Sequence, residues 1–315
     1  MSSLAEAGTP FACITRFTGD RAVVFALDDI PAGIYFDAPL ASHLPPGLAC
    51  TAAADLTARP HPMADYRERF DRAMAELRYG NSYLLNLTAA TPVECTLSLR
   101  DVFLRSEARY RLLVEEEWVC FSPEIFVEID AAGTIRSHPM KGTIDAATPD
   151  AAAVILADDK ERHEHNTIVD LIRNDLSTIA TDVRVERFRY LQSVHTLRGE
   201  LLQVSSEITG QLDGDWRSRL GEILFSLLPA GSVSGAPKEK TVEAIRAIED
   251  DDRGFYTGVF GLFDGERFDA GVLIRFIERR EEGSLHYRSG GGITHASDCD
   301  KEYRELLDKI YLPME

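Results

Sequence analysis

The clearest pattern of apolar and polar residues lies over 63–79, where apolar side chains fall three or four positions apart. This spacing predicts an amphipathic helix whose apolar face carries Met63, Tyr66, Phe70, Met74 and Leu77. Gly80-Asn81 is expected to end the helix, because glycine and asparagine are common at helix C-termini. The residues that follow predict a strand over 82–94.

Similar patterns predict the other elements. Strands are expected in a hairpin that turns at 131–133, then in the central part of the chain and near its end: 118–129, 134–140, 183–189, 197–204 and several within 258–293. Helices are expected in four places: from Thr148-Pro149-Asp150 to about residue 179 with a break, over 216–228, over 238–248, and from about residue 300.

Strands and helices are mixed without strict alternation, which favours an α+β fold over a doubly wound α/β sheet. Residues 1–60 are rich in alanine, glycine and proline and predict short strands and turns. The sequence has no internal repeat, low-complexity tract or long linker. We therefore expect a short N-terminal segment over 1–60 that packs on one compact region over 61–315.

Composition and charge exclude several classes of protein. With 315 residues, 44% of them hydrophobic and 27% charged, the chain resembles ordinary globular proteins. Its formal net charge of -18 opposes nucleic-acid binding, which depends on cationic side chains that meet phosphates. An anionic substrate would be repelled as well. Local cations, backbone NH groups or a bound metal must then attract it.

The chain shows no sign of export or membrane insertion. Its N-terminus lacks the basic start and apolar core of a signal peptide, and no apolar run approaches about 18 residues. The five cysteines are scattered without a CxxC pair, which favours reduced thiols over disulfides or structural zinc. We expect a cytoplasmic protein without membrane or nucleic-acid partners.

The last predicted helix carries a candidate site. Glu302, Glu305 and Lys309 are three and four residues apart and share one helix face. A solvated face with an ion pair between Glu305 and Lys309 would have the same pattern. The alternative is a pair of carboxylates that face a hard cation, because such cations prefer oxygen ligands.

The helix predicted around 160–175 carries further polar candidates. His163 and His165 would point to nearly opposite sides of a helix, so they cannot share a metal there. Glu164 lies four residues before Ile168, beside an apolar stripe, where a carboxylate needs a partner or an ion. The segment Arg173-Asn174-Asp175 fits polar capping and salt bridging as well as it fits a functional role.

Glycine-containing segments and one lysine complete the candidates. Gly290-Gly291-Gly292 follows a strand and would expose consecutive NH groups as an anion-binding nest, although tight turns use the same residues. The small-residue loop over 229–238 lacks the residue order of a phosphate-binding P-loop. Lys141 ends a strand beside Gly142, and taken alone it fits an ordinary surface lysine.

Together these segments resemble the chorismate-binding enzyme family, which includes anthranilate, aminodeoxychorismate, isochorismate and salicylate synthases. The matching motifs occur in family order: Ser122-Pro123-Glu124, Pro139-Met140-Lys141-Gly142-Thr143, Lys160-Glu161-Arg162, Ile168 to Leu176, Pro229 to Lys238, Arg253 to Gly258, Ile274-Arg275, Gly290 to Ile293, and Glu302-Tyr303 to Lys309. Each motif alone is weak, but together they are specific.

The resemblance implies two large antiparallel β-sheets packed together, with helices outside and the site between them. It implies that Glu164 and Glu305, with Glu302 close by, hold Mg²⁺ that binds the ring carboxylate of chorismate. Glu124 is implied as the general acid, with Asn174 and Asp175 as support. The substrate-binding residues that it implies are Tyr256, Arg275, Gly290, Gly291, Gly292, Lys309, His195, Ser234 and Thr143.

Lys141 indicates the branch of the family. Aminodeoxychorismate synthases resemble this sequence in carrying lysine before Gly-Thr, where the other branches usually carry alanine. The resemblance implies that the lysine attacks C2 as the 4-hydroxyl leaves, and that ammonia then adds at C4 and expels the lysine. Since the attacking amine must be partly deprotonated, we expect the pKa of Lys141 to lie below about 10.4.

The expected reaction is therefore the formation of 4-amino-4-deoxychorismate from chorismate and ammonia, in the 4-aminobenzoate and folate pathway. A separate glutamine amidotransferase subunit would supply the ammonia, because none of the five cysteines lies in a G-x-C-x-G elbow. The alternatives are anthranilate synthase component I and a catalytically inactive chorismate-binding paralogue.

Leu84 departs from the pattern of both groups of relatives. Branches that use water carry an activating lysine at the position that aligns with Leu84, and leucine cannot act as a base. Branches that use ammonia usually carry glutamine there. Water chemistry is therefore disfavoured.

Overall fold

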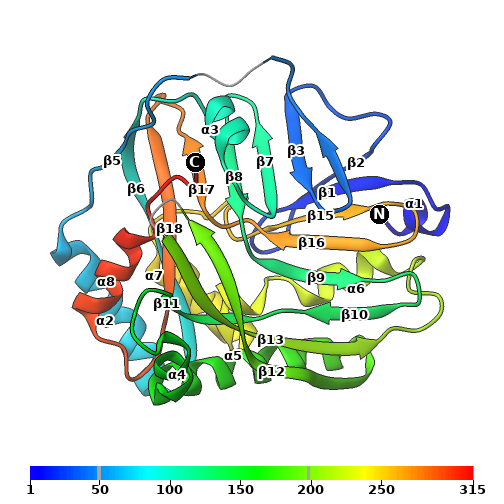
Figure 1. The fold of residues 1–315 in the computed structure, drawn as a ribbon. Coiled ribbons are helices and arrows are strands. Elements are labelled where there is room, and N and C mark those ends of the chain that lie inside the picture. Colours follow the sequence, from blue (N-terminus) through cyan, green and yellow to red (C-terminus); the bar gives the residue numbers. More distant parts are fainter. Residues whose placement is uncertain (48–50, 197–198, 315) are drawn as a thin grey trace.

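The computed structural model describes residues 1–47, 51–196 and 199–314. Within these ranges the strands form two sheets of nine strands each, and the paired strands are antiparallel. Figure 1 shows strands of the two sheets running across one another, with helices outside them. The expected α+β fold with two antiparallel sheets is confirmed.

The first sheet has the strand order β11-β13-β10-β9-β16-β15-β1-β2, and β12 also pairs with β13. Its strands are β1 (Phe11–Thr15), β2 (Ala22–Ala26), β9 (Ile125–Ile129), β10 (Thr134–Ser137), β11 (Met140–Asp145), β12 (Thr181–Thr196), β13 (Gly199–Gln211), β15 (Val259–Phe263) and β16 (Phe268–Val272).

The second sheet has the order β14-β6-β18-β17-β8-β7-β3-β4, and β5 also pairs with β6. Its strands are β3 (Ile34–Ala38), β4 (Ala41–His43), β5 (Leu56–Ala58), β6 (Leu84–Cys95), β7 (Tyr110–Val114), β8 (Trp118–Ser122), β14 (Gly235–Ala236), β17 (Phe276–Arg279) and β18 (Leu285–Ile293). The N-terminal strands β1 to β5 thus belong to the same two sheets as the rest of the chain.

The helices cover these sheets in groups. They are α1 (Ser2–Glu6), α2 (Met63–Tyr79), α3 (Leu99–Arg105), α4 (Ala151–Ala157), α5 (Asp159–Ser177), α6 (Leu220–Leu227), the 3-10 turn η1 (Gly231–Val233), α7 (Lys238–Ile248) and α8 (Cys299–Asp308). Helices α2, α7 and α8 pack near β6 and β18, whereas α4 and α5 pack on β11 to β13. None of the described helices is both long enough and apolar enough to cross a membrane.

Hydrophobic clusters fill the spaces between these layers. One cluster joins the two sheets directly and includes Ile14 and Phe260 from the first sheet and Phe36 and Phe276 from the second. A second cluster lies between the first sheet, α5 and α6, and a third holds α2, α7 and α8 against β6. The burial of these apolar surfaces is the main favourable term for folding.

Two of the connections at which the chain passes from one sheet to the other carry candidate residues, and we call these two the crossings. Strand β8 lies in the second sheet and β9 in the first, and Pro123-Glu124 forms the crossing between them. Strands β16 and β17 make the reverse crossing, which contains Arg275. The prediction of one continuous strand over 118–129 is therefore wrong. The chain changes sheets at Pro123, which has no NH to donate to a strand ladder.

Most other elements lie where the sequence pattern placed them. The helix predicted over 63–79 is confirmed by α2, which ends at Gly80 with a left-handed φ of 88°. The predicted helix over 238–248 is confirmed by α7. The expected break after Thr148 occurs at Asp158, whose side chain accepts a hydrogen bond from the NH of Glu161 and so begins α5.

Other boundaries differ from the predictions. Helix α4 begins at Ala151, after Asp150 with its left-handed φ of 52°, and not at the Thr148-Pro149 pair. Helix α6 is shorter than 216–228, because the NH of Trp216 closes a turn on the carbonyl of Asp213. Strands β12 and β13 are longer than predicted because they pair along their whole lengths. Residues 197–198 lie outside the described part of the chain.

Strand β12 is irregular although it is long. Its register with β13 shifts three times, and two of its residues, Asp182 and Arg189, have left-handed φ angles of 51° and 48°. Such β-bulges bend a strand and increase its local twist.

A buried guanidinium ties together several elements near the centre of the fold. Arg253 donates hydrogen bonds of 2.7 Å to the carbonyls of Asn86 in β6 and Val233 in η1, and it pairs with Glu249 at 2.7 Å. Only 2% of the Arg253 side chain and 5% of the Glu249 side chain are exposed. Glu249 also accepts hydrogen bonds from the NH and hydroxyl of Thr88 in β6.

We predict that Arg253→Met lowers the free energy of unfolding by about 3–5 kcal/mol, because it leaves the carboxylate of Glu249 buried without its cation. Urea unfolding measures the change. The double variant Arg253→Met/Glu249→Gln should recover part of the loss. Arg59→Met, which breaks an exposed pair with Glu94, serves as the control and should cost about 1 kcal/mol or less. Equal losses in Arg59→Met and Arg253→Met would contradict the prediction.

Candidate active site

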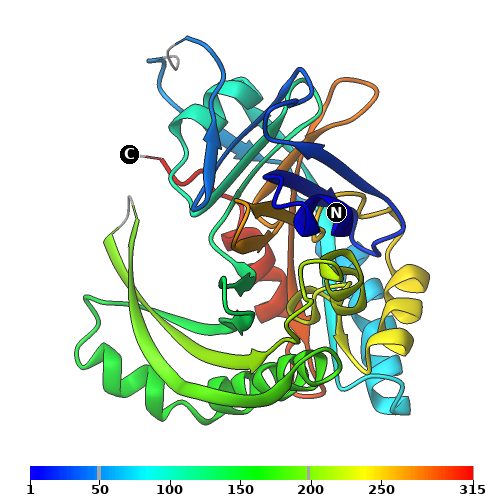
Figure 2. The same ribbon diagram turned by 90° about the vertical axis from the view of Figure 1, so that its right-hand side faces the viewer.

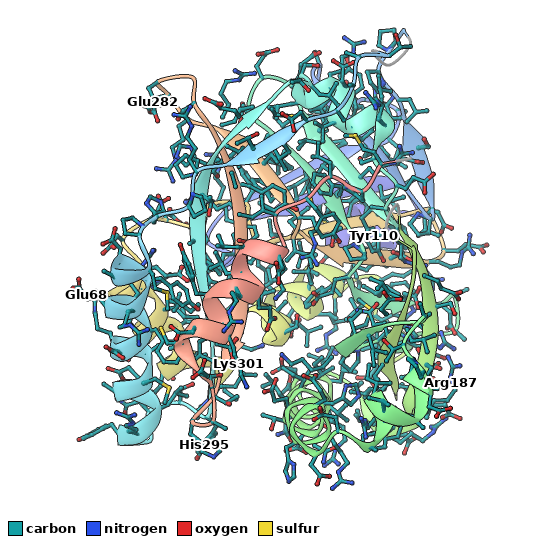
Figure 3. All side chains as sticks on the ribbon, turned by 60° about the vertical axis from the view of Figure 1, so that its left-hand side comes forward. Glu68, Tyr110, Arg187, Glu282, His295 and Lys301 are labelled. Atoms are coloured by element: carbon teal, nitrogen blue, oxygen red, sulfur yellow. The ribbon has the colours of Figure 1, made fainter. Side chains whose placement is uncertain are left out.

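Four parts of the fold bring the candidate residues together: the two crossings, β11 with α5, β18, and α8. In Figure 2, α8 stands opposite the sheet region formed by β11 to β13. Figure 3 shows α8, marked by Lys301, between α2, marked by Glu68, and strand β12, marked by Arg187. Residues separated by more than 180 positions, such as Glu124 and Lys309, influence each other electrostatically here.

Lys141 and Glu164 form an ion pair at this site. Lys141 lies on β11 and Glu164 on α5, and the Nζ–Oε2 distance is 2.9 Å. The side chain of Glu164 is 10% exposed, so the carboxylate beside the apolar stripe of α5 does have a partner. Burial acts to lower the pKa of Lys141, but Glu164 and Glu305 outweigh it and the pKa lies above the ordinary value. The expectation of a lowered pKa is therefore wrong for this arrangement of charges.

The two histidines of α5 point to different surroundings, as expected. His163 is exposed and its Nδ1 lies 2.6 Å from the carbonyl of Asp159. His165 is fully buried, and its Nε2 lies 2.6 Å from the hydroxyl of Ser206 in β13. Burial, together with Arg189, lowers the pKa of His165 to about 4, so this imidazole is neutral at physiological pH.

The three glycines lie in a regular part of β18, where Gly290, Gly291 and Gly292 pair with β6. The interpretation as a nest is wrong, since a nest requires left-handed or turn conformations, and these residues continue a strand. The pairing of β17 with β18 ends at Arg288. Among the described strands, none therefore covers the other edge of the glycine segment, and backbone groups on that edge face the site.

The same glycines leave room for the side chains of α8. A Cβ atom on Gly291 would lie 3.7 Å from carboxylate oxygens of both Glu302 and Glu305 and 3.8 Å from Nζ of Lys309. Lys309 donates a 2.8 Å hydrogen bond to the carbonyl of Gly290 and pairs with Glu305 at 2.8 Å. The face formed by Glu302, Glu305 and Lys309 is thus turned toward β18.

Glu124 lies in the first crossing and has the properties of an acid. Burial raises its pKa, although a hydrogen bond from Ser232 and the charges of Arg275 and Lys309 act in the opposite direction. Ser232, in the turn η1, donates its hydroxyl hydrogen to Oε1 of Glu124. A carboxyl group with a raised pKa beside two cations is suited to give a proton to a bound anion.

Arg275 lies in the second crossing and is held by the C-terminal tail. Its φ is 55°, a left-handed value that is uncommon for arginine. Its Nε donates a 3.2 Å hydrogen bond to the hydroxyl of Tyr311, and its guanidinium lies 5.3 Å from the centre of that ring. The hydroxyl of Tyr287 in turn donates to the backbone carbonyl of Tyr311, which fixes the tail.

The remaining expected residues have different surroundings. Tyr256 is buried between the sheets, and burial raises its pKa to about 12. The hydroxyl of Ser234 is buried and donates to the carbonyl of Ala230. Thr143 is exposed on β11, two residues after Lys141. The backbone of His195 belongs to β12, and its side chain lies outside the described part of the structure.

The carboxylates fit a hard cation by their chemistry, since Glu164, Glu302 and Glu305 offer oxygen donors from two helices. Within the described ranges, however, they are not gathered into a group of three that would enclose an ion. Glu164 is paired with Lys141, and Glu305 is paired with Lys309. A cation would therefore enter where lysine ammonium groups now lie against the carboxylates.

Sequence reasoning missed three residues of this region. Ser232 was noted only as part of a small-residue loop, Tyr311 was not singled out, and Lys238 had no assigned role. Lys238 pairs with Asp175 of α5 at 2.9 Å and donates to the carbonyl of Leu227. All three act through partners that are distant in sequence, so no local spacing could have indicated them.

Comparison with known proteins identifies the family. Residues 49–315 match the model of the chorismate binding enzyme family. A protein of Haemophilus influenzae described as uncharacterized and PabA-like is 44% identical over 313 residues, which cover 98% of this chain and 93% of that protein. A similarly described protein of Pasteurella multocida is 53% identical over 255 residues, covering 81% and 78%. The chain belongs to the chorismate binding enzyme family, and chorismate is the substrate of this family.

The fold agrees with this assignment. A crystal structure described as a 2,3-dihydroxybenzoate-specific isochorismate synthase, DhbC, from Bacillus anthracis superposes with a TM-score of 0.72. The superposition covers 98% of this chain and 84% of that chain at 22% identity. The likeness shows a common fold.

We predict that Tyr311→Phe raises the KM for chorismate roughly fivefold and leaves kcat nearly unchanged, because Arg275 loses a hydrogen bond of about 1 kcal/mol that orients it. Steady-state kinetics of chorismate consumption measures both constants. Tyr303→Phe, which removes a hydroxyl on α8 that bonds the carbonyl of His61, is the control and should leave KM unchanged. An unchanged KM with a lowered Tm in Tyr311→Phe would assign Tyr311 a purely structural role.

Proposed function

We propose that the chain converts chorismate and ammonia to 4-amino-4-deoxychorismate. The observation that carries this proposal is the position of Lys141. Its Nζ lies 2.9 Å from the carboxylate of Glu164, and the negative charge of Glu305 also raises its pKa. The resemblance to aminodeoxychorismate synthases implies that a lysine at this position is the nucleophile. The high identity to PabA-like proteins supports the same branch.

Arg275, Lys309 and backbone groups of Gly290 to Gly292 would bind the carboxylates of chorismate. Their positive charge lies at the site itself, so the substrate can bind although the whole protein carries a net charge of -18. The buried hydroxyl of Tyr256 and the raised pKa of Glu124 add donors in the same region. Binding at fixed points orients the ring for the following steps.

The chemical steps would use Lys141 and Glu124. The neutral amine of Lys141 attacks C2, the ring double bonds shift, and the 4-hydroxyl leaves as water with the proton that Glu124 donates. Ammonia then adds at C4, the double bonds shift back, and the amine of Lys141 is expelled from C2. The enolpyruvyl group stays attached, so no pyruvate forms.

Glu164 and Glu305, with Glu302 beside them, would hold Mg²⁺. When bound, the ion would supply positive charge for the ring carboxylate of chorismate. Ligation would also offset the negative charge of Glu164 and Glu305 that now raises the pKa of Lys141.

A separate glutamine amidotransferase subunit would supply ammonia. The chain itself offers no cysteine in a nucleophile elbow. Leu84, in β6, lies with its Cδ1 only 3.0 Å from where a Cβ on Gly292 would be. An apolar side chain therefore borders the glycine segment, and it provides no base to activate water.

The test is to incubate the purified chain with chorismate, Mg²⁺ and ammonium chloride and to identify the products by chromatography and mass. We expect aminodeoxychorismate, formed faster as the pH rises and more ammonia is free. Glutamine should support almost no turnover until an amidotransferase subunit is added. Anthranilate with pyruvate would identify an anthranilate synthase component I, and isochorismate would identify a water-using enzyme. Absence of any turnover under all conditions would indicate an inactive chorismate-binding paralogue.

We predict that Lys141→Ala lowers aminodeoxychorismate formation by about 100-fold or more, because the covalent route is lost. Some attack of ammonia at C2 should appear in its place, since the vacated space resembles that of the alanine-bearing branches. Mass spectrometry of the products distinguishes the two outcomes. Lys240→Ala, on the exposed side of α7, is the control. An unchanged rate and product in Lys141→Ala would exclude lysine as the nucleophile.

We predict that EDTA abolishes turnover and that Mg²⁺ restores it, because the carboxylates of the site would otherwise repel the anionic substrate. Glu164→Ala and Glu305→Ala should each lower kcat by about 100-fold or more with little change in Tm. Glu243→Ala, at an exposed position of α7, should retain full activity. Full activity in EDTA would rule out the metal assignment.

A further inference from the structure

A cavity of about 30 Å³ lies beside Glu124 and has three polar side chains in its wall besides that residue: Ser137, Asp175 and Ser232. Apolar side chains of β9, α5, α6 and β16, together with Pro139, Ala230 and Gly231, form the rest of the wall. A water molecule needs roughly 10–15 Å³ of such space and two to four polar partners. The cavity therefore has room for about two water molecules.

This cavity leads from Glu124 to Asp175. Ser232 donates a hydrogen bond to Oε1 of Glu124, and its neighbour Gly231 lies beside Asp175, because a Cβ added to Gly231 would be 3.3 Å from Oδ2. Asp175 is paired with Lys238 at 2.9 Å, and 21% of its side chain is exposed. The cavity thus connects the acid of the first crossing with a carboxyl group that touches solvent.

We infer that Asp175 and the waters of this cavity return a proton to Glu124 after each turnover. The inference rests on the proposed function, in which Glu124 protonates the departing 4-hydroxyl. Asp175 does not touch the substrate in this scheme and acts through Glu124. Family resemblance gave Asp175 only a supporting role, whereas the cavity gives it a path to the acid.

The transfer conserves protons at every step. Ser232 passes its hydroxyl proton to the Glu124 carboxylate and takes a proton from a cavity water. The carboxylate of Asp175, which is paired with Lys238, first takes a proton from solvent and then gives it to that water. Each group ends as it began, apart from Glu124, which is protonated again.

The charges around the two carboxyl groups suit this transfer. Chorismate bound to Arg275 and Lys309 would cover Glu124 from the substrate side, so the proton has to arrive by another route. Burial raises the pKa of both Glu124 and Asp175, which helps each carboxyl to hold a proton. Arg275 and Lys309 oppose this effect at Glu124, and Lys238 opposes it at Asp175.

The competing explanation is that Asp175 only forms an ion pair that joins α5 to Lys238. Two variants separate the explanations. Asp175→Asn keeps the shape of the side chain but cannot carry a proton between solvent and the cavity. Lys238→Met breaks the same ion pair and keeps the carboxyl group. A structural role predicts equal effects of the two variants, whereas the relay requires only the carboxyl group.

The experiment measures kcat, KM for chorismate and the solvent deuterium isotope effect with ammonium as the nitrogen source, alongside Tm. We expect Asp175→Asn to lower kcat about tenfold or more, because proton return becomes slow, with KM nearly unchanged. Its isotope effect on kcat should exceed that of the wild type. Lys238→Met should keep a kcat within about threefold of the wild type. Formate, which replaces the lost carboxyl group, should accelerate Asp175→Ala and leave Lys238→Met unchanged.

A wild-type kcat in Asp175→Asn would overturn the relay. Equal losses of kcat and Tm in Asp175→Asn and Lys238→Met, without rescue of Asp175→Ala by formate, would also overturn it. The failure of the proposed function looks different. If the wild-type chain made anthranilate, that function would be wrong, yet the relay could still be tested because the 4-hydroxyl departs in that reaction as well.

Discussion

The buried ion pair between Arg253 and Glu249 fixes the positions of β6 and η1 beside the site. One guanidinium holds a carbonyl of β6 and a carbonyl of η1, and Glu249 holds the NH and hydroxyl of Thr88 in β6. A charged group so deeply buried is stable only when all of its donors are satisfied. The strand that pairs with the glycine segment and the turn that carries Ser232 are therefore held at a fixed separation.

At the site itself, positively and negatively charged side chains lie in direct contact. Lys141 offsets Glu164, Lys309 offsets Glu305, and Arg275 lies with Lys309 near Glu124. In a partly buried region these interactions are stronger than the same pairs would be at the surface. The arrangement explains how a chain with a large negative net charge can belong to a family that binds a dianion. It also explains why the pKa of Lys141 lies above its ordinary value although the side chain is partly buried.

The sequence indicated the regular elements well and the contacts between distant segments poorly. Helix α2 follows from apolar spacing and a terminating glycine, both of which are local signals. The exchange of sheets at Pro123 could not be seen, because it depends on which strand lies alongside. Gly290 to Gly292 were interpreted as a nest, although pairing with β6 keeps them in a strand. Ser232 and Tyr311 carry no local pattern, since their importance comes from Glu124 and Arg275.

The bulges of β12 have a consequence for how the protein behaves among copies of itself. A straight edge strand of this length would offer a row of backbone donors and acceptors to any other exposed strand. The left-handed residues Asp182 and Arg189 bend and twist this edge of β12, so its donors and acceptors do not lie in one straight row. The exposed charged side chains of Arg184, Glu186 and Arg187 also oppose the close approach of another strand. These features hinder the longest of the described strands from pairing with the sheets of neighbouring molecules.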